Sequence, residues 1–133
     1  MQLFRRLTSV MAILLMFTAT DVTADSYDVF VPITKYISAG DVESLSAWFA
    51  DNLEISILSR TTDCSKNQAT QILKFFFRNH RPRSFEISHT ASGPNSKYAL
   101  GNLSAGGEVF QVTIFVSRCG PSYKIQQLKI DRR

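Results

Sequence analysis

The residue best suited to chemistry in this chain is His89. It follows Phe85 and Ile87 at alternate positions, so in an extended strand all three side chains would point to the same side. Tyr98 belongs to the next predicted strand and could lie near His89. An imidazole beside a phenol can move a proton or orient a polar ligand. A partly solvated histidine at a strand end is the simpler interpretation, because no carboxylate is placed to orient the ring.

Other polar residues interrupt apolar strands and could orient a ligand in an apolar cavity. Strand alternation favours the other interpretation, in which they lie on the solvent face of the sheet. Phe75 lies at the edge of the apolar arc of a predicted helix, where it would contact a neighbouring helix or form the rim of a pocket. The candidate pocket therefore comprises His89, Tyr98, Phe75, Gln111, Thr113 and Gln127.

The acidic residues lie mainly at predicted helix caps, turns and solvent faces of strands, so none has a clear inward position. This counts against acid–base catalysis, which needs a carboxylate inside the pocket. We therefore name no catalytic residue. The two histidines and two cysteines lack the close spacing of a zinc site, so we expect no metal and no cofactor. Cys64 begins a helix, where a thiolate is favoured, but no histidine is placed to activate it. Whether Cys64 and Cys119 pair stays open.

A basic cluster follows the third helix, from Arg78 to Arg83. Nucleic-acid binding needs a track of cations with exposed aromatic residues, and here the neighbouring phenylalanines are predicted to point into the core. Cations at a helix C-terminus also stabilise the helix dipole without any partner. We expect no nucleic-acid partner, while an acidic protein or glycan partner stays open.

Residues 1–24 have the pattern of an export signal. Arg5 and Arg6 precede an apolar run over residues 7–17, and small residues end at Ala24. The run is shorter than the roughly 20 residues of a membrane span, so none is expected after the signal is removed. The pattern predicts a periplasmic or secreted protein with a single domain over residues 25–133.

Three helices are predicted in that domain. The first has the apolar stripe Phe30, Ile33 and Ile37 and ends at Gly40. The second starts at the cap Asp41 and includes Phe49. The third starts at the capping box formed by Ser65 and Gln68 and runs toward Pro82; its three phenylalanines are interpreted as core residues.

Five strands are predicted, beginning with residues 53–58 and a polar loop over 59–63. Four strands follow the third helix, with a Gly106–Gly107 hairpin and a β-bulge near Gln126 and Gln127. The order is helix, helix, strand, helix and four strands. This predicts an α+β fold, in which three helices pack on a curved, mainly antiparallel five-stranded sheet shaped like a cone.

Several segments carry a family resemblance: GDVESLSAWFADNLEISIL, SKNQATQILKFFF, RSFEISHTA, KYALGNLSAGGEVFQVTIFV and YKIQQLKI. The chain resembles the nuclear transport factor two-like (cystatin-like) superfamily, and more closely the exported bacterial family called domain of unknown function 4783. The resemblance implies a curved sheet on three helices, with its first and last strands parallel. That geometry would separate Cys64 from Cys119. The resemblance also implies that a homodimer through the sheet is plausible, but it implies no activity, because the superfamily includes isomerases, dehydratases and non-catalytic domains.

The sequence thus predicts an exported non-catalytic domain that binds a small apolar ligand or a protein partner through its cone or its sheet face. The alternative is a cavity enzyme of the isomerase, dehydratase or hydrolase type that uses His89 and Tyr98. A third interpretation is a structural module whose cone is filled by Phe76, Phe77 and Trp48.

Overall fold

The computed structural model describes residues 28–133, so the predicted signal peptide over residues 1–24 lies outside the described residues. The elements follow the order α2 (Phe30–Ala39), α3 (Val42–Ser46), β1 (Phe49–Ile57), β2 (Arg60–Ser65), α4 (Lys66–Asn79), β3 (Pro82–Ser92), β4 (Ser96–Ala105), β5 (Glu108–Cys119) and β6 (Ser122–Arg132). No helix within residues 28–133 is long and apolar enough to cross a membrane.

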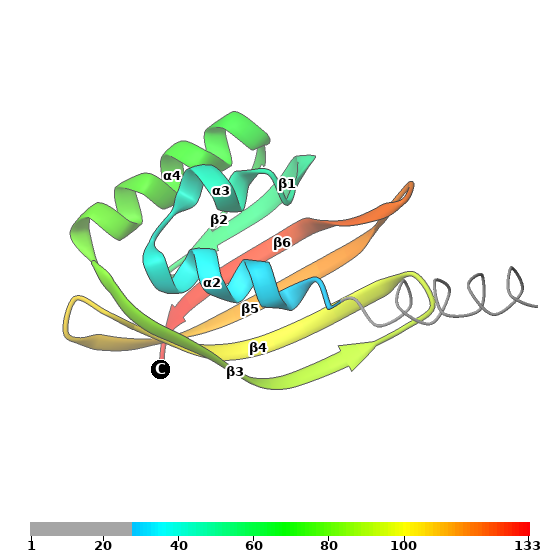
Figure 1. The fold of residues 1–133 in the computed structure, drawn as a ribbon. Coiled ribbons are helices and arrows are strands. Elements are labelled where there is room, and N and C mark those ends of the chain that lie inside the picture. The colour runs from blue at the N-terminus through cyan, green and yellow to red at the C-terminus, as the bar shows by residue number, and fades with distance from the viewer. Residues whose placement is uncertain (1–27) are drawn as a thin grey trace, which may run out of the picture.

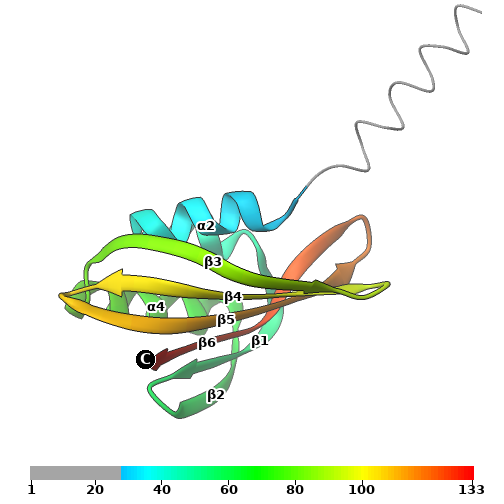
Figure 2. The ribbon, with the colours of Figure 1, turned by 90° about the horizontal axis from the view of Figure 1, so that it is seen from below.

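The strands form one curved sheet in the order β2-β1-β6-β5-β4-β3. The helices α2, α3 and α4 all lie on one face of this sheet (Figure 1), and the view from below looks onto the opposite face (Figure 2). The predicted α+β class is confirmed. The predicted five-stranded, mainly antiparallel sheet is wrong in two respects: the sheet has six strands, and it is mixed because β1 and β6 run parallel.

The unpredicted strand is β2, which covers most of the segment interpreted as a polar loop. Most of its side chains are exposed, so it lacks the apolar alternation by which strands are recognised. It pairs antiparallel with β1 through a tight turn at Leu58 and Ser59, whose φ angles are 50° and 73°. A hairpin turn with two positive φ angles usually contains asparagine or glycine. Leu58 and Ser59 are neither, so the sequence gives no signal for this turn.

The second helix is shorter than predicted, because α3 ends at Ser46 and Phe49 is already in β1. Phe49 pairs with Ile125 of β6, and the Ile125 amide donates to the Trp48 carbonyl at 2.6 Å. The sheet therefore begins before Leu53, where alternation first becomes visible in the sequence.

The predicted helix boundaries at the caps are confirmed. Gly40 ends α2 in the left-handed conformation, with φ at 68°. The Asp41 side chain accepts hydrogen bonds from the Ser44 hydroxyl and backbone amide, and these bonds lower the pKa of Asp41. Ser65 and Gln68 form the capping box at the start of α4.

The core lies between α4, α2 and the inner face of the sheet. Phe76 of α4 stands edge-on to Phe110 of β5, with 5.3 Å between the ring centroids, and both side chains are buried. Phe77 is also buried, whereas 63% of Phe75 is exposed, so the interpretation of all three phenylalanines as core residues is wrong for Phe75. This part of the predicted cone is therefore filled with side chains.

The two cysteines do not form a disulfide. Cys64 is buried at the end of β2, and Cys119 is exposed at the end of β5. Burial, with a smaller contribution from the Asp63 carboxylate, raises the pKa of the Cys64 thiol. Less of this thiol is ionised near neutral pH than in a free cysteine, so it is a weak nucleophile.

Phe76→Ala should lower the free energy of unfolding by about 3–5 kcal/mol, because it leaves a cavity between α4 and the sheet. Phe75→Ala is the matched control, since it removes the same side chain from an exposed position of the same helix. It should change the free energy of unfolding by about 0.5 kcal/mol or less. Urea denaturation measures both. Equal losses in the two variants would contradict the assignment of Phe76 to the core.

A maleimide reagent should label the folded protein once, at Cys119, and the protein unfolded in guanidinium twice, because Cys64 is buried with a raised pKa. Intact-mass spectrometry counts the labels. Cys119→Ser should leave the folded protein unlabelled. Rapid double labelling of the folded protein would show that Cys64 is accessible, and labelling of neither cysteine after unfolding would indicate a disulfide.

Candidate functional site

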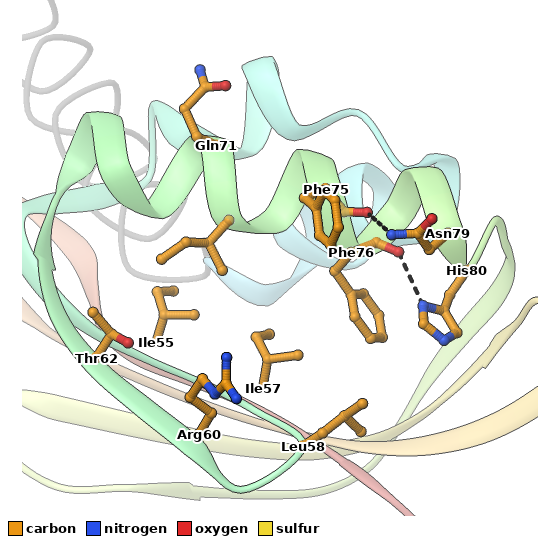
Figure 3. A pocket seen from close by; sticks show the side chains of 11 residues that line it. Ile55, Ile57, Leu58, Arg60, Thr62, Gln71, Phe75, Phe76, Asn79 and His80 are labelled. Carbon is orange, nitrogen blue, oxygen red and sulfur yellow. Dashed lines mark hydrogen bonds between the residues drawn. The ribbon is translucent and has the colours of Figure 1, made fainter.

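An apolar cleft lies between α4 and the β1–β2 hairpin, beside the part of the core that Phe76 fills. We call it the hairpin pocket (Figure 3). Its volume is about 640 Å³, within the range of roughly 300–1,000 Å³ that is typical of small-molecule sites. Eleven residues line it: Ile55, Ile57, Leu58, Arg60, Thr62, Gln71, Ile72, Phe75, Phe76, Asn79 and His80.

One wall of the hairpin pocket is a stripe of α4. Gln71, Phe75 and Asn79 are four residues apart, as are Ile72 and Phe76, so all five lie on neighbouring rows of the helix. Phe76 is buried at the base, and Phe75 is exposed at the rim. The Asn79 side-chain amide donates to the Phe75 carbonyl at 3.2 Å, which holds the last turn of the helix in place.

The opposite wall comes from the hairpin. Ile55 pairs with Thr62 and Ile57 pairs with Arg60, and directly paired residues of two strands share a face. Both isoleucines face α4, so Thr62 and Arg60 also lie on the inner face of the sheet. Figure 3 shows the Arg60 side chain directed from β2 toward the pocket. The pocket thus combines an apolar base with a polar rim.

His80 closes the end of the pocket. Its ring stacks on Phe76, with 4.5 Å between centroids and 18° between planes, and stands edge-on to Phe110. Its Nδ1 lies 3.2 Å from the Phe76 carbonyl oxygen, so a proton on Nδ1 makes this contact a hydrogen bond. Its Nε2 lies 3.9 Å from a Glu108 carboxylate oxygen. Both nitrogens thus face protein groups, and the ring acts as part of the wall.

Five of the six residues in the candidate pocket lie on the other face of the sheet. Strand pairing places them in adjacent rows there: Gln127 beside Phe115 and Tyr98, Thr113 beside Leu100 and His89, and Gln111 beside Asn102. We call this surface the outer face. Only Phe75 lines the hairpin pocket. The sequence therefore grouped residues that do share a surface, but that surface is opposite the helices.

His89 reaches the outer face because β3 contains a bulge. Ile87 pairs with Gly101, whereas His89 pairs with Leu100, so Ser88 is the extra residue. The bulge changes the alternation after Ile87, and the side chain of His89 is exposed. Tyr98 is 38% exposed on the neighbouring strand. The expectation that His89 continues the inward side of Phe85 and Ile87 is wrong for this reason.

The three predicted polar contacts also have surface positions. Gln111 is exposed opposite Asp131, and Thr113 is half-buried opposite Lys129. The Gln127 side-chain amide donates to the Glu54 carboxylate across the parallel β1–β6 pair. Strand alternation favoured this solvent-face interpretation for all three.

The sequence did not reveal Arg60 and His80 as pocket residues. Arg60 lies in the segment that the sequence predicts to be a loop, and the sequence pattern places His80 only in the basic cluster. One signal in the sequence could have placed Arg60. In an extended segment the side chains of residues 60, 62 and 64 point to the same side, and the apolar Cys64 indicates that this side faces the core. Within residues 28–133 no group of three or more histidine, cysteine or acidic side chains is close enough to hold a metal ion.

Comparison with known proteins gives the family and the fold. The model of the family described as "Domain of unknown function (DUF4783)" matches residues 30–131. A DUF4783 family protein from Bacteroides uniformis has a TM-score of 0.77 and 24% identity, and the match covers 80% of this chain and 98% of that one. No match was found among curated proteins.

Two more distant structures show the same fold. A protein of the NTF2-like family from Streptomyces avermitilis has a TM-score of 0.58 and 10% identity, over 77% of this chain and 90% of that one. A domain of unknown function with a cystatin-like fold from Nostoc punctiforme has a TM-score of 0.61 and 11% identity, over 77% of this chain and 71% of that one. The resemblance inferred from the sequence is thus confirmed, and the chain belongs to the DUF4783 family, whose fold it shares with NTF2-like and cystatin-like proteins.

Proposed function

We propose that this protein is an exported, non-catalytic domain that binds a small, mainly apolar ligand in the hairpin pocket. The observation that carries the proposal is the exposed Phe75 at the rim of a cleft whose base is apolar. Exposed aromatic surface beside a concave apolar site is typical of ligand binding, because the ligand removes that surface from water. Export to the periplasm or the exterior is proposed from the pattern of residues 1–24.

Catalysis is not part of the proposal, because the lining of the hairpin pocket includes no aspartate or glutamate. Its one histidine, His80, directs both ring nitrogens at protein groups. The alternative enzyme would use His89 and Tyr98, which lie on the outer face, where solvent reaches both. General acid–base chemistry needs such groups within hydrogen-bond reach of a bound substrate.

A second copy of the chain is the proposed partner of the outer face. No helix among the described residues covers this face (Figure 2), and it includes Tyr98, Leu100 and Phe115 as neighbouring, partly exposed side chains. In a dimer with two-fold symmetry, both subunits contribute the same surface patch to the interface. An apolar patch is complementary to its own copy, so the outer face suits such a dimer. This interaction is independent of the hairpin pocket.

Thr62→Trp should weaken binding of an uncharged apolar fluorophore, N-phenyl-1-naphthylamine, because the indole would occupy part of the pocket from β2. Thr61→Trp is the matched control: it adds the same side chain to the same strand, but Thr61 faces the outer face, beside Ser56. Fluorescence titration should show at least a tenfold loss of affinity for Thr62→Trp only, which corresponds to about 1.4 kcal/mol.

Equal binding by the wild type and Thr62→Trp would place the fluorophore elsewhere and contradict the pocket assignment. Circular dichroism and thermal melts of both variants are needed beside the titration, so that a loss of binding is not confused with a loss of fold.

Tyr98→Lys should shift the protein from dimer to monomer in sedimentation velocity, because it places a charge among the partly exposed apolar side chains of the outer face. Val31→Lys is the control, since Val31 is a similarly exposed apolar residue on α2, 66% exposed, and far from that face in the fold. A wild-type protein that is monomeric at every concentration measured would exclude the dimer.

A further inference from the structure

We infer that the ligand of the hairpin pocket is an amphiphile with an apolar body and one carboxylate, and that Arg60 binds the carboxylate. This inference rests on the proposed function and adds to it the chemical class of the ligand. Its basis is the position of a single arginine at the mouth of a cleft whose base is apolar and whose lining includes no other lysine, arginine or acidic residue.

The position of Arg60 follows from strand pairing. β2 presents residues 60, 62 and 64 to the inner face, with Cys64 buried, Thr62 in the middle and Arg60 at the open end. The turn at Leu58 and Ser59 sets this register. A long side chain at this point covers the mouth with its guanidinium, while its methylene groups continue the apolar wall of Ile57 and Leu58.

The charge of the pocket is unbalanced. Arg60 is the only lysine, arginine, aspartate or glutamate among the eleven lining residues. Within residues 28–133 no carboxylate forms an ion pair with Arg60. Asp63 lies on the opposite face of β2, since it pairs with Glu54. The Asp131 carboxylate accepts a hydrogen bond from the Ser59 amide and forms an ion pair with Lys129. The site therefore attracts one negative charge from outside.

The guanidinium group determines which anion fits. Its planar fork makes two parallel hydrogen bonds to a carboxylate, and a monoanion balances its single charge. The apolar body of the ligand would then lie along Ile57, Ile55 and Ile72 toward Phe76, with Phe75 closing over it. A fully apolar ligand would use the same wall but leave the guanidinium beside apolar atoms without a partner.

Arg60 also has an interpretation that needs no ligand. β2 is an edge strand of the sheet, and an inward-pointing charge on an edge strand discourages pairing with another chain. That role predicts that neutral Arg60 variants associate through the edge, and it predicts no preference for charged ligands. The two roles therefore differ in ligand selectivity.

The test compares decanoate with decan-1-ol, which share an apolar chain and differ in head-group charge, by isothermal titration calorimetry on protein purified from the producing cell. The wild type should bind decanoate about tenfold more tightly than decan-1-ol at neutral pH. Arg60→Gln should bind decanoate about tenfold more weakly than the wild type and leave the affinity for decan-1-ol unchanged. Arg60→Lys should retain part of the preference, because lysine keeps the charge without the planar fork.

The matched control is Arg83→Gln, which removes an exposed arginine from β3 at the opposite edge of the sheet and should change neither affinity. Equal affinities of the wild type for the two ligands, or an unchanged preference in Arg60→Gln, would overturn the carboxylate assignment and leave the apolar pocket in place. If the wild type binds neither decanoate nor decan-1-ol, the proposed function of the pocket is overturned, and the assignment of Arg60 as the carboxylate-binding residue is overturned with it.

Discussion

The contact between α4 and the inner face of the curved sheet organises this molecule. Phe76 of α4 packs against Phe110 of β5, and the His80 ring contacts both of these rings. Large apolar groups removed from water contribute most of the free energy of folding. This contact fixes the end of α4 against β5. The β1–β2 hairpin meets the helix nearer its start, and the hairpin pocket is the space left between them.

The sheet separates two environments. On its inner face, rows of apolar side chains run across the strands, such as Ala99, Ile114, Leu128 and Ile55. On its outer face the rows combine polar, charged and aromatic side chains, including His89 and Tyr98. A one-residue bulge transfers His89 from the first environment to the second, because side chains alternate with a period of two. Its chemistry therefore belongs to the surface and is separate from the pocket.

The proposal of a non-catalytic role rests on the small number of titratable groups in the lining of the hairpin pocket. The base of this pocket is apolar and its rim is polar. The ring nitrogens of His80 face the Phe76 carbonyl and Glu108, and Arg60 is the one lysine, arginine or acidic residue of the lining. An arginine remains protonated at any physiological pH, so it orients an anion without exchanging protons. The arrangement suits selection of a ligand by shape and charge.

Much of the architecture follows from local signals in the chain. The capping box at Ser65 and Gln68, the left-handed Gly40 and the change from helical to alternating periodicity placed most helices and strands, because each signal acts between residues close in sequence. The family resemblance also supplied the parallel pairing of the first and last strands, which periodicity alone does not give.

What the sequence by itself determined is the α+β class, the helix caps, most of the core and the bulge in the last strand. Tertiary structure decided the sixth strand, the face on which His89 lies and the location of the pocket. β2 has no apolar pattern of its own, and it is extended because its backbone pairs with β1. Arg60 and Phe75 are 15 positions apart in the sequence. They line the same pocket only because α4 packs back across the hairpin, and contacts between elements are not encoded in local periodicity.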